Sequence, residues 1–324
     1  MSNLPLVSVL MPLYNKSAYI ADAIESVLNQ TYPTIELIII DDGSTDDGLN
    51  IATRYISEKV FVYSQDNQGA SAARNAAFKK CKGEFIQYLD SDDLLHPEKV
   101  NEQMKRVKDS SLTIATSHWQ YFVDNTISEK QGNSTLFRDF DNVTDFLLKT
   151  MYQGFPIHSW LIPRLIVEKA GNWDEKISIF DDKDFIMRVI SVSECVKFCH
   201  LSYCYYRMPQ NNRHLSAQRD RLALLGALKY LDNAEFCLTK LNSNETTQIL
   251  SCLYKKLLVI ATNDMKIIQK LKQRSFRIGL VPDCNQNALI RLCQKILGLR
   301  ITFWVIYWRA KYFQIKIKKR ENET

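Results

Sequence analysis

Two short acidic runs each follow an apolar segment, and their residue types could bind a metal ion. Ile38-Ile39-Ile40 leads into Asp41-Asp42-Gly43-Ser44-Thr45-Asp46, and residues 85–89 lead into Asp90-Ser91-Asp92-Asp93. Carboxylates this close together repel one another unless a cation lies among them. Oxygen ligands of this kind suit Mg²⁺ or Mn²⁺, ions that usually bind phosphate groups as well. The second run therefore predicts a divalent-cation site.

Each run also has a purely structural alternative. An aspartate at the end of the first apolar segment can accept a hydrogen bond from a nucleobase N–H, but it can equally form an Asx turn that caps the next helix. The second run could be an acidic turn with one residue as a helix cap. A calcium loop of the EF-hand type is disfavoured, because its glycine is missing.

A glycine and an arginine lie between the two runs. Residues 65–75 read Gln-Asp-Asn-Gln-Gly-Ala-Ser-Ala-Ala-Arg-Asn, in which Gly69 opens a helix of small residues that allows a close approach. Arg74 falls more than one turn inside that helix, so it could reach a site or lie on a solvated face. The chain has neither G-x-x-x-x-G-K-[ST] nor G-x-G-x-x-G, so a metal would have to hold any phosphate.

A third acidic group, Asp181-Asp182-Lys183-Asp184, precedes Arg188. A carboxylate near the start of a helix, facing a cleft, could act as a general base. The alternative is helix capping with Asp184 and Arg188 as an i,i+4 pair, and for these two residues we favour that alternative.

These groups must be positioned by strands and helices, and the first part of the chain alternates between the two patterns. Apolar, β-rich runs occur at residues 7–10, 35–40, 60–63 and 85–89, and residues 20–28 show helical periodicity with Asn15 or Ser17 as N-cap. A further helix is expected to begin with Asp46 and Asp47 in its first turn. This alternation predicts a parallel sheet covered on both faces, with ligands at the carboxyl ends of its strands. The acidic runs follow those ends.

The rest of the chain divides into a mixed part and a helical part. Short strands at residues 113–122 and 196–206 surround helices at 166–170 and 184–192. Beyond Ser216 the pattern is almost wholly helical, and Leu222, Leu225, Leu228 and Leu231 lead into further amphipathic segments. We therefore predict a domain over residues 1–216 and a helical region over 217–324. With 46% hydrophobic and 24% charged residues, the 324-residue chain is expected to be globular.

Composition also bears on compartment and partners. The eight cysteines form no C-x-x-C pair, so we expect buried thiols in a reducing compartment. Residues 4–13 are interrupted by two prolines and no basic residue precedes them, which favours a first strand over a signal peptide. Nucleic-acid binding is disfavoured, because the aspartate-rich site would repel a phosphate backbone.

In their order and spacing the motifs resemble the family 2 glycosyltransferases of the bacterial surface-polysaccharide type. The resemblance covers roughly residues 5–216 and implies the GT-A fold, a Rossmann-like, mostly parallel sheet with flanking helices, here with a helical C-terminal extension. The matching segments are Val7-Ser8-Val9-Leu10-Met11-Pro12-Leu13-Tyr14-Asn15, Asp41-Asp42-Gly43-Ser44-Thr45-Asp46, residues 67–75, Asp90-Ser91-Asp92-Asp93 and Asp181-Asp182.

The resemblance assigns roles to individual residues. Asp42 would accept a hydrogen bond from the uracil N3–H, and Asp92 would be the direct metal ligand in the D-x-D motif that it forms with Asp90. Asp182 would be the catalytic base, with Asp181 as second choice because many relatives carry glutamate there. The other implied contacts to the nucleotide are Pro12, Tyr14, Gly69, Arg74 and Asp90, and the implied donor-phosphate loop holds Arg207, His214 and Ser216.

The implied function is inverting transfer of a hexose (glucose, galactose or N-acetylhexosamine) from a UDP-sugar, with Mn²⁺ or Mg²⁺, to a hydroxyl of a saccharide acceptor. The acceptor would be linked to a lipid diphosphate, in the assembly of O-antigen lipopolysaccharide, capsule or exopolysaccharide. Two alternatives remain: a metal-dependent phosphatase or phosphotransferase of the haloacid dehalogenase type, and a non-catalytic protein that binds sugar nucleotides.

The basic, aromatic residues 301–313 bear on location. They suit the interface of an anionic membrane, or else form a core helix with a solvated basic face. No uncharged stretch reaches the roughly 18 residues of a spanning helix. We therefore expect a cytoplasmic protein, peripheral on the inner face of the plasma membrane.

Overall fold

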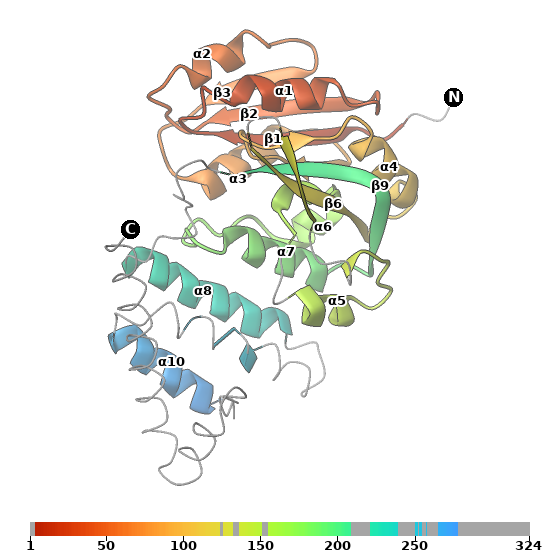
Figure 1. Ribbon diagram of the computed structural model, residues 1–324. Coiled ribbons are helices and arrows are strands. Elements are labelled where there is room, and N and C mark those ends of the chain that lie inside the picture. The colour runs from red at the N-terminus through yellow and green to blue at the C-terminus, as the bar shows by residue number, and fades with distance from the viewer. Residues whose placement is uncertain are drawn as a thin grey trace.

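The computed structural model describes residues 4–123, 126–131, 136–150, 155–208, 221–238, 250–251, 253–254, 257 and 265–277. Within these residues the chain forms a five-stranded sheet, a four-stranded sheet and the helices that cover them (Figure 1). The predicted α/β class with a mostly parallel central sheet is confirmed.

The five-stranded sheet has the order β3-β2-β1-β4-β8. Its first four strands in the chain pair in parallel and only β8 is antiparallel, to β4. All four apolar runs predicted as strands form it, because strands covered on both faces are apolar at nearly every position. The strands are β1 (Val7–Leu13), β2 (Ile35–Asp41), β3 (Val60–Ser64), β4 (Phe85–Tyr88) and β8 (Ile162–Pro163).

The two faces of this sheet are buried in two different apolar clusters. Alternate side chains of a strand point to opposite faces, so Val9 and Met11 pack toward α1 (Ile20–Leu28), whereas Leu10 packs toward α3 (Ala70–Lys80). In Figure 1, α1 and α2 (Gly48–Thr53) lie above the sheet and α3 lies below it. The carboxyl ends of β1, β2 and β4 are thereby held at one edge.

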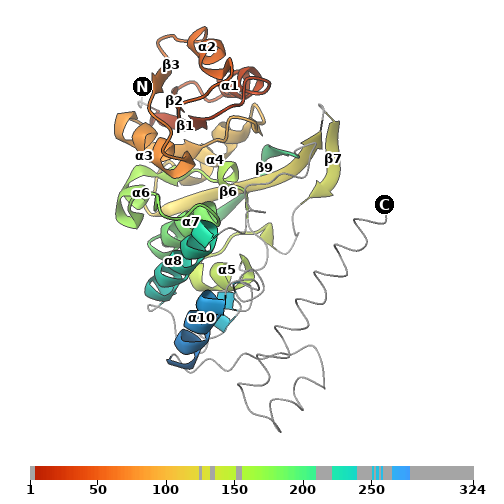
Figure 2. The same cartoon turned by 90° about the vertical axis from the view of Figure 1, so that its left-hand side faces the viewer.

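The second sheet has the order β5-β9-β6-β7. Its core is the parallel pair of β6 (Thr113–Val123) and β9 (Cys195–Arg207), two long strands that cross the molecule and extend with β7 (Thr126–Gln131) to one side of it (Figure 2). The short β5 (Leu94–Leu95) pairs with β9 and begins directly after the second acidic run. That run therefore joins the two sheets and is anchored at both ends.

The remaining helices are α4 (Lys99–Val107), α5 (Val143–Thr150), α6 (Arg164–Ala170), α7 (Asp181–Ser191), α8 (Arg221–Leu238) and α10 (Met265–Arg277). Of these helices, α4 packs on β6 and β9, α6 packs on β4 and β8, and α5 and α8 pack on α7. A Cβ at Gly226 of α8 would lie 3.1 Å from the carbonyl oxygen of Lys176, so a small residue suits that contact. Of the four leucines singled out in the sequence of α8, Leu228 and Leu231 are buried, whereas Leu222 and Leu225 are exposed.

The predicted boundary at residue 216 stays a prediction. Ala227 and Leu231 of α8 and Leu271 of α10 belong to the same apolar cluster as Leu10 of the central sheet. Residues 301–313, for which a membrane contact is predicted, lie outside the described residues. No helix in the described part of the chain is long and apolar enough to span a membrane.

Candidate active site

The loops after β1 and β2 are tied together by backbone hydrogen bonds. Asn15 Oδ1 accepts from the backbone N–H groups of Thr45 at 2.8 Å and Asp46 at 3.3 Å, and Asp46 accepts from those of Ser17 at 2.8 Å and Gly48 at 2.9 Å. Burial raises the pKa of Asp46, but the hydrogen bonds from Ser17 and Gly48 outweigh it and hold the pKa below its usual range. The carboxylate of Asp46, in the first acidic run, therefore has a structural role: it fixes the loops after β1 and β2.

These contacts overturn two local predictions. Helix α1 has Tyr19 at its N-cap with no side-chain cap, so neither Asn15 nor Ser17 caps it. Helix α2 begins at Gly48 and has no acidic residue in its first turn, so the expected placement of Asp46 is wrong. Asn15 and Ser17 are bonded instead to the loop after β2, and Asp46 precedes α2, where its carboxylate accepts from Ser17 and from Gly48, the first residue of that helix.

Asp42 is almost fully buried and supports the loop that begins α3. Its Oδ1 accepts from Gln65 Nε2 at 2.7 Å and from the Gln68 backbone N–H at 2.9 Å, while Oδ2 accepts from the Gly69 backbone N–H at 2.8 Å. Gly69 has φ = +92°, in the region that favours glycine. Of the other residues predicted to contact the nucleoside, Pro12 is buried within β1 and Tyr14 is 47% exposed.

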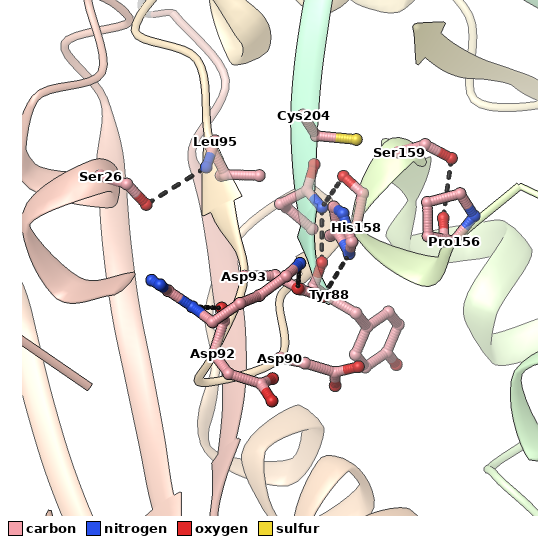
Figure 3. A network of polar contacts seen from close by, with 12 residues as sticks. Ser26, Tyr88, Asp90, Asp92, Asp93, Leu95, Pro156, His158, Ser159 and Cys204 are labelled. Atoms are coloured by element: carbon pink, nitrogen blue, oxygen red, sulfur yellow. Dashed lines mark hydrogen bonds and ion pairs between the residues drawn. The ribbon is translucent and has the colours of Figure 1, made fainter. Parts of the chain in front are cut away.

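The second acidic run is different, because each of its three carboxylates faces a cationic side chain. Arg74 Nη2 lies 2.7 Å from Asp90 Oδ1, Lys16 Nζ is ion-paired with Asp92, and His158 Nδ1 lies 3.0 Å from Asp93 Oδ2. In Figure 3 the side chains of Asp90 and Asp92 point away from His158, whereas Asp93 points toward it. Asp90 and Asp92, whose side chains are 31% and 27% exposed, are therefore the two carboxylates of the run that a ligand could reach.

Arg74 links this turn to the third acidic group. Its side chain is 6% exposed, its Nη1 lies 2.9 Å from Asp181 Oδ2, and its guanidinium lies 4.3 Å above the ring of Trp173. Burial lowers the pKa of Arg74, but Asp90 and Asp181 raise it above its ordinary value. The sequence left Arg74 open between a site and a solvated face; the structure excludes the solvated face, since Arg74 is buried between the second and third acidic groups.

The pKa values of Asp90 and Lys16 reflect these ion pairs. Burial raises the pKa of Asp90, but the charge and hydrogen bond of Arg74 outweigh it and hold the pKa below its usual range. Burial lowers the pKa of Lys16, and the Asp92 carboxylate more than offsets this and raises it. Asp90 is thus ionised at neutral pH, the state in which a carboxylate binds a cation.

Asp93 is held inside the protein by β9 and by His158. Its Oδ1 accepts from the Arg207 backbone N–H at 2.8 Å, and Arg207 Nε donates to the Asp92 carbonyl oxygen at 2.8 Å. Burial lowers the pKa of His158, but the Asp93 carboxylate raises it well above its ordinary value, so the pair is ionic. The prediction that Arg207 belongs to the donor loop remains a proposal; His214 and Ser216, assigned to the same loop, lie outside the described residues.

Sequence reasoning missed His158 and the buried lysine behind it. Lys99 Nζ, fully buried, donates to Gln87 Oε1 at 2.5 Å and to Gln103 Oε1 at 2.6 Å. These glutamines donate to the carbonyl oxygens of His158 at 3.0 Å and Ser159 at 2.8 Å. Burial lowers the pKa of Lys99 to about 8. A polar Gln87 inside an otherwise apolar strand was the one local signal of this network.

The third acidic group lies at the start of α7. Asp182 accepts from the Lys183 backbone N–H at 2.8 Å, and burial together with the neighbouring Asp181 carboxylate raises the pKa of Asp182 to about 6. Further along the helix, Arg188 Nε donates to Asp184 Oδ2 at 2.9 Å, which confirms the predicted structural pair. Asp184 is thereby excluded as an open base, while Asp181 is engaged by Arg74.

The donor set fits a hard divalent cation. Asp92, whose side chain is 27% exposed, already binds one cationic group, and Asp90 uses only one oxygen for Arg74. No group of three or more His, Cys, Asp or Glu side chains in the described part of the chain could hold a metal alone. One or two carboxylates, with substrate phosphates and water completing the shell, is the usual arrangement for Mg²⁺.

Comparison with known proteins identifies the class. The glycosyl transferase family 2 model matches residues 8–171, and the chain belongs to that family. An uncharacterized glycosyltransferase of Rickettsia typhi is 30% identical over 82% of this chain and 86% of its own length. The chondroitin synthase of Escherichia coli is 31% identical over 71% of this chain, which spans only 34% of that protein.

Solved structures agree on the fold. The crystal structure of S. aureus TarS 1-349 in complex with UDP-GlcNAc superposes with a TM-score of 0.58 at 17% identity, over 85% of this chain and 92% of that one. The fold is therefore GT-A, as the resemblance implied. Membership of the family sets aside the alternative of a haloacid dehalogenase-type phosphatase.

Proposed function

We propose that this protein is a metal-dependent, inverting glycosyltransferase that moves a hexose from a UDP-sugar to a hydroxyl of a saccharide acceptor. The observation that carries the proposal is Arg74, a buried cation that binds Asp90 of the acidic turn and Asp181 at the start of α7. Arg74 therefore links the acidic turn that is expected to bind the metal to the start of α7, where the base is expected. TarS, of the same fold, was crystallised with UDP-GlcNAc and with UDP, which supports a UDP-sugar donor.

The donor would bind along the edge formed by β1, β2 and β4. Exposed Tyr14 is available to contact the base, with Pro12 beneath it, while Asp42 and Gly69 shape the loop beside it. Asp42 already accepts three hydrogen bonds, so its proposed bond from the uracil N3–H would use a remaining lone pair. Arg74 and Arg207 would keep the carboxylates below the diphosphate in place.

Asp92, with Asp90, would hold Mn²⁺ or Mg²⁺. A bound divalent ion neutralises the charge that develops on a leaving diphosphate, which supplies several kcal/mol of transition-state stabilisation. Lys16 would leave Asp92 when the ion binds. The protein's own contribution would be to keep Asp90 ionised through Arg74 and to fix the turn through the contacts of Arg207 with Asp93 and with the Asp92 carbonyl oxygen.

Asp182 would take the proton from the acceptor hydroxyl as it attacks the anomeric carbon from the face opposite the diphosphate. Its pKa of about 6 leaves it ionised at neutral pH and close to the value at which a general base works best. Asp181, the second choice, is committed to Arg74 and is the weaker candidate.

For the acceptor we propose a saccharide linked to a lipid diphosphate, in the assembly of a surface polysaccharide such as O-antigen or capsule. Relatives support polysaccharide synthesis: besides the chondroitin synthase, the Bacillus subtilis protein TuaG, named as a putative teichuronic acid biosynthesis glycosyltransferase, is 42% identical over 33% of this chain. We further propose cytoplasmic location and contact of residues 301–313 with the inner membrane face.

The test is a screen of UDP-glucose, UDP-galactose and UDP-N-acetylglucosamine with lipid-diphosphate GlcNAc or GalNAc, with Mn²⁺ or with EDTA. We expect UDP release with at least one donor in Mn²⁺ and its loss in EDTA. UDP binding without turnover of any donor would instead support a non-catalytic sugar-nucleotide-binding protein. Calorimetry that shows no effect of Mn²⁺ or Mg²⁺ on UDP binding would contradict the metal role.

A further inference from the structure

We propose that Trp119, Tyr121 and Tyr206 form a platform on which a pyranose ring of the acceptor stacks. The inference rests on the proposed transfer to a saccharide and names the residues that would receive it. None of the three was among the site residues expected from the sequence.

The three rings share one face of the second sheet. Trp119 and Tyr121 are alternate residues of β6, and Tyr121 is directly opposite Tyr206 on the parallel strand β9. The ring centroids lie 4.9 Å apart for Trp119 and Tyr121 and 5.8 Å apart for Tyr121 and Tyr206. All three side chains are partly exposed. They therefore form a row of edge-to-face rings, in which Trp119 also packs against both apolar clusters on its inner side.

One end of this row lies at the candidate active site. The ring of Tyr206 stacks on His158, with centroids 6.0 Å apart, and His158 in turn contacts Asp93. Burial raises the pKa of Tyr206, and so do the carboxylates of Asp93, Asp90, Asp92 and Asp182. Tyr206 therefore lies within electrostatic range of both the second acidic run and the proposed base, Asp182.

The chemistry of the row fits an uncharged sugar ring. Aromatic faces carry partial negative charge and attract the weakly positive C–H groups that a pyranose presents on one face, while tyrosine hydroxyls can bond its hydroxyl groups. An uncharged ring is also not repelled by the carboxylates that lie near Tyr206. An acceptor that lies on Tyr121 and Tyr206 would deliver its hydroxyl to the space between Asp92 and Asp182.

The opposite face of the same strand supplies a matched control. Tyr205 is the next residue of β9, so it points away from the row, and it packs near His96 and Phe122. It is also partly exposed. Its substitution removes a tyrosine of the same size from the same strand without touching the platform.

The experiment measures binding of the full chain, with UDP and Mn²⁺, to a microarray of immobilised bacterial di- to tetrasaccharides. We expect the wild type to bind a subset, Trp119→Ala and Tyr121→Ala to bind it at least tenfold more weakly, and Trp119→Phe to recover part of the binding. Tyr205→Ala should bind as the wild type does. Thermal melting and calorimetry with UDP would verify that each variant is folded.

The outcomes separate this inference from the proposed function. Failure of the wild type to bind UDP or to turn over any UDP-sugar would defeat the proposed function, and this inference with it. Donor turnover combined with saccharide binding that neither Trp119→Ala nor Tyr121→Ala weakens would overturn the platform alone. So would a wild type that turns over donor but binds no saccharide.

Discussion

The turns after β2 and β4 look alike in sequence, since each is a run of aspartates after an apolar strand, but their carboxylates have different partners. After β2, Asp42 and Asp46 accept hydrogen bonds mainly from backbone N–H groups of neighbouring loops. After β4, Asp90 and Asp92 bind the side chains of Arg74 and Lys16. The first turn therefore fixes neighbouring loops, and the second binds cationic side chains.

This difference indicates which turn can exchange its partner. A backbone N–H cannot leave without unfolding its loop, and a buried one that loses its acceptor costs about 1–3 kcal/mol. Lys16 is 37% exposed and long, so it can withdraw into water at little cost. In the proposed function, a metal ion would replace it at Asp92 with the scaffold intact. Substitutions that separate these two kinds of turn test the comparison directly.

The largest effect is expected for Asp92→Ala. Loss of the metal ligand should remove several kcal/mol of transition-state stabilisation and lower transfer about a thousandfold, with little change in melting temperature. The measurement is UDP release in Mn²⁺ beside a thermal melt. Activity close to the wild type would show that the turn after β4 is no metal site.

Asp182→Asn should lower transfer about 10²–10⁴-fold, because the amide cannot accept the acceptor proton. Donor binding should persist, since Asp182 contacts only the Lys183 backbone among the hydrogen bonds that the described residues show for it. Turnover and calorimetry with UDP are the two measurements. Normal turnover would move the base assignment to Asp181.

Lys16→Gln should tighten Mn²⁺ binding about tenfold, because the amide removes a positive charge that competes for Asp92. Electron paramagnetic resonance of free Mn²⁺ gives this affinity without any turnover. Lys105→Gln, which removes an exposed lysine paired with Glu102 on α4, is the control for loss of one positive charge. Equal Mn²⁺ affinities for the wild type and Lys16→Gln would show that Lys16 does not compete with the metal ion for Asp92.

Asp46→Ala should destabilise the fold by about 1 kcal/mol, because the N–H groups of Ser17 and Gly48 lose their acceptor but can partly turn to water. For a chain of this size the melting temperature should fall by about 2 °C. Mn²⁺ affinity should stay as in the wild type. A changed metal affinity with an unchanged melt would reverse the roles of the two turns.

The smallest effect concerns pH. Asp182 must be ionised to act as a base, so transfer should fall as the pH drops through about 6. Asp181→Asn removes a like charge, which lowers the pKa of Asp182 and should shift this acidic limb to lower pH by less than one unit. A pH–rate profile of both proteins measures the shift. A limb that stays in place would mean that another group titrates.

Local sequence predicted the strands well but the partners of the carboxylates poorly. The runs at β1 to β4 are recognisable because burial on both faces requires an apolar residue at nearly every position. The N-cap expected for α1 failed because Asn15 and Ser17 bond to a loop about 30 residues away. His158 and Lys99 went unnoticed, since a lone buried histidine or lysine leaves no periodic pattern.

The amino-acid sequence by itself therefore determined the order of strands, the positions of the acidic runs at their ends, and the family to which the chain belongs. These features depend on neighbours along the chain. Only the tertiary structure decided that Lys16 meets Asp92, 76 residues away, and that Arg74 meets Asp181, 107 residues away. Such pairs form because two sheets and α7 converge at one edge, and the charge of a residue does not specify which opposite charge the fold will bring to it.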